Sequence, residues 1–557
     1  MKFTRLLYSL LILFVLPAMA WSTSQSDTGF LVVAPDRGFM GNEEIREAFD
    51  SFEKEYVSSL VFMTEKDTKR FLQEGIDKLT SQNVDDIVVL PLFISNDHPM
   101  YKLATKTLKE DLGEQNTQIS IRVAEVMSRS YLTAEILANR IGELSKKSKN
   151  ESLVVIGTGA SDKSEKDAMR EDIQNVLAMN EGRFNFQGES VIVFSNNGGR
   201  SDNAQKQLEE KLAEIRQQEL TPVVVPFSFT QKLDGMMAFS SRIRSLVAEY
   251  EASFNGKDLT PHKNIELWLT KQANSYLPVT KDNLGVIFMP HGSDYSWNRR
   301  MMDAVESLQD EYMIEHAFSM ADPHLVKKAV QRLEKRGAKA ITVVRVFSLE
   351  SSFQGKTEYM LGLKKQYGHG GHSYGGLPPR IVTGSELYTL GGLEDSPLFA
   401  EALLDRALEL SENPQKETVV LVGHGTGSDE ANNHWENNLD RIATHMEKTA
   451  EQEGISFRDI EYGTWREDWP ELRDKSINNI RDIVKKASEN DGTAIVIPAR
   501  TTHGGHADRW LSDLEFKHNG KGFAPHPLFV KWFEKQIQQS LDHFNKDVEN
   551  TDVLIAQ

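Results

Sequence analysis

The chain contains no cysteine, which excludes disulfide bonds, iron–sulfur clusters and zinc sites built on thiolates. Any metal ion must therefore be held by imidazole, carboxylate, thioether or backbone oxygen ligands. Basic residues are also scarce, because 64 Lys and Arg stand against 82 Asp and Glu, a formal net charge of −18. Nucleic acids are bound through a basic face that neutralises phosphates, so this excess of acidic residues argues against a nucleic-acid partner.

Long apolar runs are absent except at the N-terminus. There, Lys2 and Arg5 precede an apolar run over residues 6–16, and small residues follow at 18–20. This order is typical of a secretory signal peptide, here residues 1–20. The alternative is an uncleaved anchor, but the run is shorter than the roughly 20 residues that span a bilayer. We therefore expect an exported, periplasmic protein without a membrane span after cleavage, and the sequence leaves its oligomeric state open.

Short apolar strands alternate with polar, helix-like segments along the chain. The expected first strands lie at 30–35, 153–157, 284–290 and 418–423, and a second set of apolar strands lies at 87–93, 222–227, 341–347 and 494–498. Continuous apolar strands that alternate with helices are typical of parallel sheets buried on both faces. The sequence therefore predicts an α/β fold of four modules with parallel sheets flanked by helices, arranged as two lobes of two modules each.

The length also requires several domains, because 557 residues exceed the about 100–200 residues of one ordinary domain. The expected boundaries are 29–148 for module 1, 150–255 for module 2, 283–412 for module 3 and 417–545 for module 4. The polar segment 256–282 contains Pro261 and Pro278, and we expect it to link two halves of the chain.

Histidines follow the ends of several expected strands. In an open α/β sheet, ligands bind beyond the carboxyl ends of the strands. His291 and His424 follow the first strands of modules 3 and 4, each before a glycine, whereas His98 and His506 follow the third strands of modules 1 and 4. For one isolated His-Gly sequence, the alternative is a tight turn in which the imidazole only caps or packs.

Module 4 alone has histidine at both strand ends, which makes His424 and His506 the candidate site. Two imidazoles without a thiolate suit a late first-row divalent metal, and two ligands leave positions open for water or substrate. His503, in the same His-Gly-Gly-His loop, is a candidate third ligand. A neutral imidazole, with an ordinary pKa of about 6.5, also serves as a base near neutral pH.

Carboxylates and tryptophans near these histidines have two interpretations each. The carboxylates either support the ligands and carry protons or form a solvated acidic face, and the tryptophans either flank a flat ligand or fill the core. The carboxylates are Asp429, Glu430, Glu461 and Asp508, and the tryptophans are Trp297, Trp435, Trp465, Trp469 and Trp510.

The segment 419–426 of module 4, with the later Pro498 and His506, resembles the class II metal chelatases of the sirohydrochlorin/cobalt chelatase type. Segments 284–293 and 317–347 of module 3 and the third-strand sequence of module 1 also resemble this family. The resemblance implies that His424 and His506 are catalytic and hold a divalent metal, Co²⁺, Fe²⁺, Ni²⁺ or Zn²⁺, facing a tetrapyrrole. It also places His291 and His98 at metal-binding positions, each without its partner in the same module.

The resemblance implies an exported chelatase-like enzyme, a lyase that inserts a divalent metal into a tetrapyrrole of siroheme or cobalamin biosynthesis, or removes it. We expect module 2, which lacks both histidines, to be structural. Two alternatives stay open: a non-catalytic periplasmic carrier of metal or tetrapyrrole, and a scaffold of decayed modules. A carrier would bind its ligand without turnover, and a scaffold would bind neither metal nor tetrapyrrole.

Overall fold

A computed structural model describes residues 28–112, 119–195, 203–230, 233–234, 237–367, 377–549 and 553–555 of the chain. The expected signal peptide, residues 1–20, lies outside these ranges. Within them, every helix is too short or too polar to cross a membrane.

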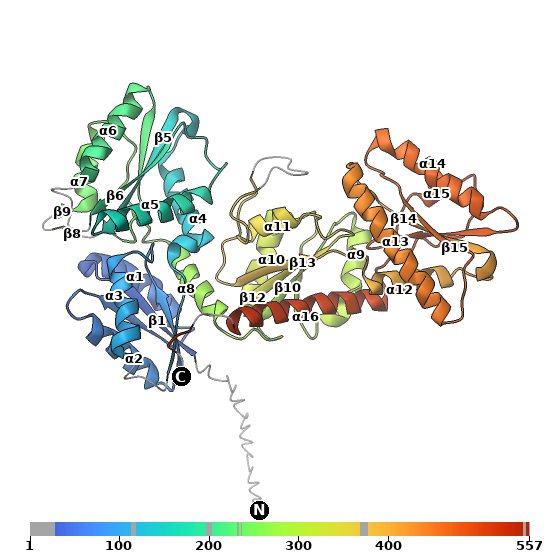
Figure 1. Cartoon of the computed structure of the whole chain (residues 1–557), viewed down its shortest axis with the longest axis horizontal. Coiled ribbons are helices and arrows are strands. Elements are labelled where there is room, and N and C mark those ends of the chain that lie inside the picture. The colour runs from blue at the N-terminus through green and yellow to red at the C-terminus, as the bar shows by residue number, and fades with distance from the viewer. Residues whose placement is uncertain are drawn as a thin grey trace, which may run out of the picture.

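The expected strands form four parallel sheets, one in each module (Figure 1). Module 1 contains β1 Thr28–Pro35, α1 Gly38–Phe52, β2 Ser58–Met63, α2 Thr68–Thr80, β3 Asp86–Pro91, α3 Pro99–Lys106, η1 Thr107–Leu112, β4 Ser120–Val123, η2 Met127–Arg129 and α4 Tyr131–Leu144, followed by η3 Ser148–Asn150. Module 2 contains β5 Glu151–Ala160, α5 Lys163–Ala178, β6 Glu189–Ser195, α6 Asn203–Gln217, β7 Thr221–Pro226, β8 Leu233–Asp234, β9 Met237–Ala238 and α7 Phe239–Ala248, followed by α8 Lys263–Ser275.

Modules 3 and 4 repeat this order of strands and helices. Module 3 contains β10 Leu284–Pro290, α9 Tyr295–Asp303, η4 Glu306–Leu308, β11 Met313–His316, α10 Pro323–Lys335, β12 Ala340–Val346, α11 Gln354–Met360, β13 Glu386–Gly391 and α12 Pro397–Leu408, followed by η5 Pro414–Lys416. Module 4 contains β14 Glu417–Gly423, α13 Asp429–Gln452, β15 Asp459–Thr464, α14 Pro470–Ala487, β16 Thr493–Pro498, α15 Ala507–Trp510 and α16 Pro527–Glu549.

The strand orders are β17-β4-β3-β1-β2, β6-β5-β7, β11-β10-β12-β13 and β15-β14-β16. The strand β17 Val553–Ile555 runs antiparallel to β4, at the edge of an otherwise parallel sheet. Strands β10 and β14 are buried along their whole length, as expected of central strands covered by helices on both faces. The predicted α/β fold with parallel sheets flanked by helices is therefore confirmed.

The helix at the end of each module packs against the neighbouring module (Figure 1). Helix α4 packs on β7 and α5, α8 packs on β3 and α1, α12 packs on β16 and α13, and α16 packs on β12 and β13. As a result, one hydrophobic core joins modules 1 and 2, and another joins modules 3 and 4. We call these units the N-terminal pair and the C-terminal pair. The segment 256–282, expected only as a link, contributes α8, in which Trp268 and Leu269 are fully buried.

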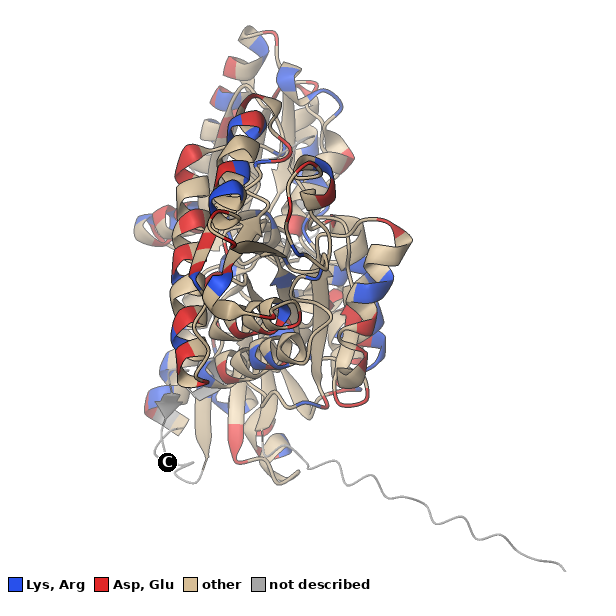
Figure 2. Cartoon of the chain, turned by 90° about the vertical axis from the view of Figure 1, so that its right-hand side faces the viewer, with Lys and Arg blue, Asp and Glu red and all other residues tan. Residues whose placement is uncertain are grey.

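Buried hydrogen bonds also join the two pairs. The Tyr131 hydroxyl donates to the Ile381 carbonyl at 2.9 Å, and Asn274 Nδ2 donates to the Gly384 carbonyl at 2.9 Å. The division into two separate lobes therefore stays a prediction. On the side shown in Figure 2, which includes module 4, acidic and basic residues are interspersed over the helices.

The two pairs repeat the same hydrogen bonds at matching positions, with the arginine bonds buried or partly buried and the glutamate bonds exposed. Arg140 of α4 and Arg406 of α12 each donate to backbone carbonyls of the segment that leads toward the next helix. Beside them, Glu143 and Glu409 each accept from a lysine and an asparagine. The bonds are Arg140 Nε to Asp258 O (2.8 Å), Arg140 Nη2 to Pro261 O (2.9 Å), Arg406 Nε to Gly522 O (3.2 Å), Arg406 Nη2 to Pro525 O, Lys257 Nζ to Glu143 (2.8 Å), Lys521 Nζ to Glu409 (2.7 Å), Asn255 Nδ2 to Glu143 (3.0 Å) and Asn519 Nδ2 to Glu409 (3.0 Å). The C-terminal pair is therefore a structural repeat of the N-terminal pair.

This repeat predicts equal stability effects in the two pairs. We expect Arg140→Met and Arg406→Met each to lower the free energy of unfolding by about 2–3 kcal/mol, because each leaves buried carbonyl oxygens without a donor. Urea denaturation measures both variants, and Arg441→Met, on the exposed face of α13, is the control with little effect. If only one of the two substitutions lowered the free energy of unfolding, the two arginines would not have equivalent roles, and the prediction would be wrong.

Candidate metal centre

Three strand ends of module 4 meet at one edge of its sheet. Because the order is β15-β14-β16, the loops after these strands lie side by side. His424 follows β14, Glu467 follows β15, and Arg500 and His506 follow β16. The two imidazoles and the carboxylate are thus brought together from segments far apart in the sequence.

The Glu467 carboxylate lies between the two imidazoles. Its Oε1 atom is 3.2 Å from His424 Nε2, and its Oε2 atom is 3.6 Å from His506 Nε2. Arg500 Nη2 donates to Oε2 and holds the carboxylate in place. Asp468 approaches His424 Nε2 from the solvent side, also at 3.2 Å, with its side chain 69% exposed against 12% for Glu467. We call His424, Glu467 and His506 the His–Glu–His site.

The hydrogen bonds of His424 leave one ring nitrogen for a cation. Nδ1 lies 2.8 Å from the Gly425 carbonyl, which only accepts, so Nδ1 carries the proton. In the neutral ring, Nε2 is then an acceptor, yet it faces the Glu467 and Asp468 carboxylates, which also only accept. This arrangement needs a proton on Nε2 or a cation between the imidazole and the carboxylates.

The charges around the site keep its groups in metal-binding forms. Burial by itself would raise the pKa of Glu467, but the Arg500 hydrogen bond and charge, with His424 and His506, lower it below its ordinary value. Burial lowers the pKa of His506, and the nearby Glu467 charge opposes this only in part. An ionised carboxylate and a neutral imidazole are the forms that bind a metal ion.

Tryptophan rings surround both imidazoles. The Trp435 ring stacks near His424 with centroids 6.2 Å apart, and the Trp469 ring meets His424 edge-on at 6.0 Å. The ring centroids of Trp510 and His506 are 4.1 Å apart. The buried ring of Trp465 packs against Trp510, with centroids 5.1 Å apart. These contacts hold the orientation of both rings, as the outer contacts of metal ligands do.

The donor set fits a divalent ion held loosely. Two imidazoles and one carboxylate are ligands that late first-row metals accept. Within the described ranges, however, no group of three or more His, Asp or Glu side chains is arranged so that it could hold a metal ion.

The other predicted histidines have different surroundings. His503 lines a neighbouring cavity together with Arg300 of module 3, where burial and then the Arg300 charge lower its pKa. His291 is exposed and repeats the geometry of His424, with Nδ1 2.7 Å from the Gly292 carbonyl. His98 is buried, and its Nδ1 accepts from the Met100 amide at 3.2 Å as the N-cap of α3.

The expected supporting carboxylates mostly bind elsewhere, and Glu467 takes their place. Asp429 pairs with Arg466 at 2.6 Å, Asp508 pairs with His518 at 2.6 Å, and Glu461 pairs with Lys486 at 3.7 Å. Sequence reasoning missed Glu467 and Arg500. No local sequence pattern marks Glu467, because its place beside His424 follows from the strand order β15-β14-β16.

A sequence model of the CbiX family matches residues 39–144, most of module 1. This match lies within module 1 and includes no part of modules 2, 3 or 4. No curated protein shows significant sequence similarity to it.

Several solved structures are similar to part of the chain. They include the sirohydrochlorin chelatase SirB from Bacillus subtilis subspecies spizizenii in complex with cobalt, with 13% identity, a TM-score of 0.32 and coverage of 44% of this chain and 93% of that chain. SirB from Bacillus subtilis with Fe³⁺ has 13% identity, a TM-score of 0.33 and coverage of 44% and 94%. A multi-domain protein from Deinococcus radiodurans, with structural similarity to chelatases and two additional novel domains, has 18% identity, a TM-score of 0.32 and coverage of 46% and 54%.

The other modules keep the strand-end loop but differ in the residue that stands at the position of His424. In modules 1, 3 and 4, an asparagine side chain accepts a hydrogen bond from a backbone amide of the loop after the first strand. These bonds run from Arg37 N to Asn42 (2.9 Å), from Ser293 N to Asn298 (2.8 Å) and from Thr426 N to Asn432 (3.1 Å). In module 2, Thr158 stands at the position of His424, and its hydroxyl lies 2.6 Å from the Ser228 hydroxyl. Module 2 thus has a hydroxyl pair where module 4 has the imidazole of His424.

The position of Glu467 predicts a change in the titration of His506. We expect Glu467→Gln to lower the pKa of His506 further, because the lost negative charge no longer favours the imidazolium ion. Histidine NMR titration of the metal-free protein measures this pKa, and Asp508→Asn, which removes the carboxylate at His518, is the control. An unchanged or higher pKa of His506 would show that Glu467 does not face it in solution.

Proposed function

We propose that the protein is a metal chelatase that inserts a divalent ion into a tetrapyrrole, or removes one, at the His–Glu–His site. The observation that carries this proposal is that Nε2 of His424 and Nε2 of His506 face the two oxygens of one carboxylate. The CbiX match to module 1 supports the same class of activity. The sirohydrochlorin chelatases are the form of this activity that we favour.

In this proposal the metal ion is a substrate, held only until the macrocycle takes it. The neutral imidazoles of His424 and His506, with the Glu467 carboxylate, bind the ion and leave positions open to the pyrrole nitrogens. Metallation releases two protons from the macrocycle as it gains the divalent ion. The imidazoles that lose the metal regain basic nitrogens, which accept these protons near neutral pH.

Residues around the His–Glu–His site have two further roles in this proposal. Arg500 keeps Glu467 ionised and oriented, as a group behind a metal ligand does. Asp468, which is mostly exposed beside His424, offers released protons a path to solvent. Imidazole and carboxylate accept Co²⁺, Fe²⁺, Ni²⁺ and Zn²⁺ alike, so availability selects the metal.

Metal titration tests the proposed site. We expect the double variant His424→Ala/His506→Ala to lose at least about 100-fold in Co²⁺ affinity, because removal of a group that merely supports a ligand already costs about 10–100-fold. Isothermal titration calorimetry measures the affinity. The matched control is His434→Ala/His445→Ala, since both residues lie on α13 and pair with glutamates away from the site.

Turnover then separates the enzyme from its alternatives. With Co²⁺ and a porphyrin, the wild type should change the absorbance spectrum of the macrocycle over time, and the His424→Ala/His506→Ala variant should not. Tight binding of metal or porphyrin without turnover would identify a carrier. Equal Co²⁺ binding by the wild type and this variant would refute the site.

Export is part of the proposal, based on the sequence of residues 1–20. We expect the protein isolated from its cells to begin after the small residues at 18–20 and to occur in the periplasmic fraction, because the apolar run is too short to anchor it. Intact mass spectrometry of that fraction measures the N-terminus. A protein that retains residues 1–20 in the cytoplasm would contradict export.

A further inference from the structure

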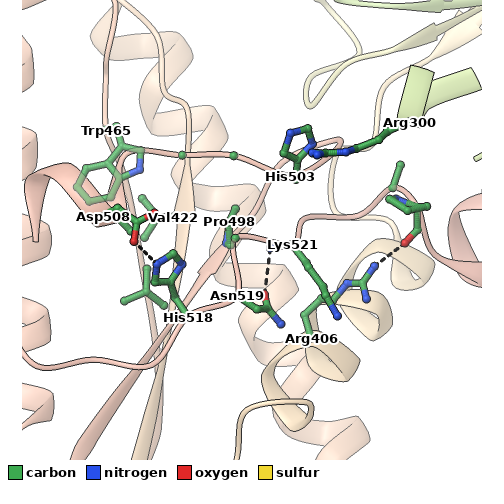
Figure 3. Close-up of a pocket in the computed structure, with 17 residues that line it drawn as sticks. Arg300, Arg406, Val422, Trp465, Pro498, His503, Asp508, His518, Asn519 and Lys521 are labelled. Atoms are coloured by element: carbon green, nitrogen blue, oxygen red, sulfur yellow. Dashed lines mark hydrogen bonds and ion pairs between the residues drawn. The ribbon is translucent and has the colours of Figure 1, made fainter. Parts of the chain in front are cut away.

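A cavity of about 550 Å³ is lined by Gly505 and Ala507, the chain neighbours of His506, whereas His424, Glu467 and His506 do not line it themselves (Figure 3). Its walls come from the loop that carries His503, from segment 518–525 of module 4, and from Arg300 of α9 in module 3. The volume lies within the range of about 300–1,000 Å³ that small-molecule sites occupy. Both members of the C-terminal pair therefore contribute to this cavity.

The polar groups of the cavity are mostly cationic or neutral. Of the described residues that line it, Asp508 alone is acidic, whereas Arg300, Arg406 and Lys521 are basic. This is the reverse of the whole chain, which carries a formal net charge of −18. The lining therefore has more basic than acidic side chains, unlike the chain as a whole.

Most of these polar groups are already bound within the protein. Arg406 and Lys521 both pair with Glu409, and the N-terminal pair repeats this arrangement, so these two residues are structural. His518 pairs with Asp508. Arg300 is different, because its exposed guanidinium has no ion pair with any carboxylate in the described parts of the chain.

Comparison with the N-terminal pair shows what Arg300 replaces. Asn42 and Asn298 have the same hydrogen bond to their strand-end loops, so Glu44 and Arg300, two residues further along, correspond. Glu44 accepts from the hydroxyls of Thr230 and Thr260, each at 2.6 Å, and so ties module 1 to module 2. At this position the C-terminal pair has a cation that faces His503 and the cavity (Figure 3).

We propose that Arg300 binds a peripheral carboxylate of the tetrapyrrole and thereby selects carboxylate-rich macrocycles. A guanidinium binds a carboxylate through two parallel hydrogen bonds, which give orientation as well as affinity. Binding one edge of the macrocycle in the cavity holds the ring against the neighbouring His–Glu–His site. Module 3 then supplies substrate recognition, and module 4 supplies the metal ligands. This inference rests on the proposed function.

Porphyrin binding by neighbouring arginine variants tests the inference. We expect Arg300→Gln to weaken binding of uroporphyrin, a carboxylate-rich porphyrin, by about 10- to 100-fold, the range for a lost charged hydrogen bond. Arg299→Gln is the matched control, because Arg299 is the adjacent residue of α9 and pairs with Asp303 on the surface. A cationic porphyrin should bind both variants equally. Fluorescence titration measures all these affinities.

Equal affinity of Arg300→Gln and Arg299→Gln for uroporphyrin would overturn the inference. Citrate distinguishes the two sources of a carboxylate: if only citrate binding depended on Arg300, the cavity would take a free carboxylate, and the inference would again fail. Co²⁺ titration of the wild type without porphyrin tests the proposed metal site separately. If Arg300→Gln and Arg299→Gln bind uroporphyrin equally while the wild type still binds Co²⁺, only the role of Arg300 is rejected, and the proposed metal site is not.

Discussion

A parallel sheet must be covered by helices on both faces, and in this protein each sheet obtains part of that cover from its neighbour. The exchange of α4 with α8 and of α12 with α16 makes each pair of modules share one core. Arg406 reaches from α12 of module 3 to the backbone of module 4 at Gly522. The cavity next to the loop that carries His506 is therefore lined by residues of two modules.

Within that frame, electrostatics distinguish module 4 from the rest of the chain. All three modules with an asparagine at the strand-end loop hold this loop in the same way, but only in module 4 do two imidazoles face one carboxylate among the described residues. Arg500 fixes Glu467 from behind, and tryptophan rings fix the imidazoles. The Arg500 hydrogen bond and the tryptophan contacts thus orient the carboxylate and the imidazoles of the candidate site.

The sequence was sufficient to predict the strands and the proximity of His424 and His506. It was insufficient to predict the carboxylate between the two imidazoles or the packing of helices on neighbouring modules. Continuous apolar runs indicate buried strands, and the strand-end rule brings His424 and His506 together. Glu467 was missed because the order β15-β14-β16 has no local signal. The helix exchange was missed because an apolar helix face does not say which sheet it covers. His98 matched a family position, but in the structure it is the N-cap of α3. Its Nδ1 atom accepts a hydrogen bond from the backbone amide of Met100.

The most direct measurement is anomalous X-ray diffraction from crystals of the mature protein grown with Co²⁺. The account predicts one strong cobalt peak bonded to His424 Nε2 and His506 Nε2, with Glu467 as a third ligand or directly behind them. A cobalt peak at His291, His98 or His503 without one at His424 and His506 would contradict the account, as would crystals in which no cobalt is bound between these two imidazoles.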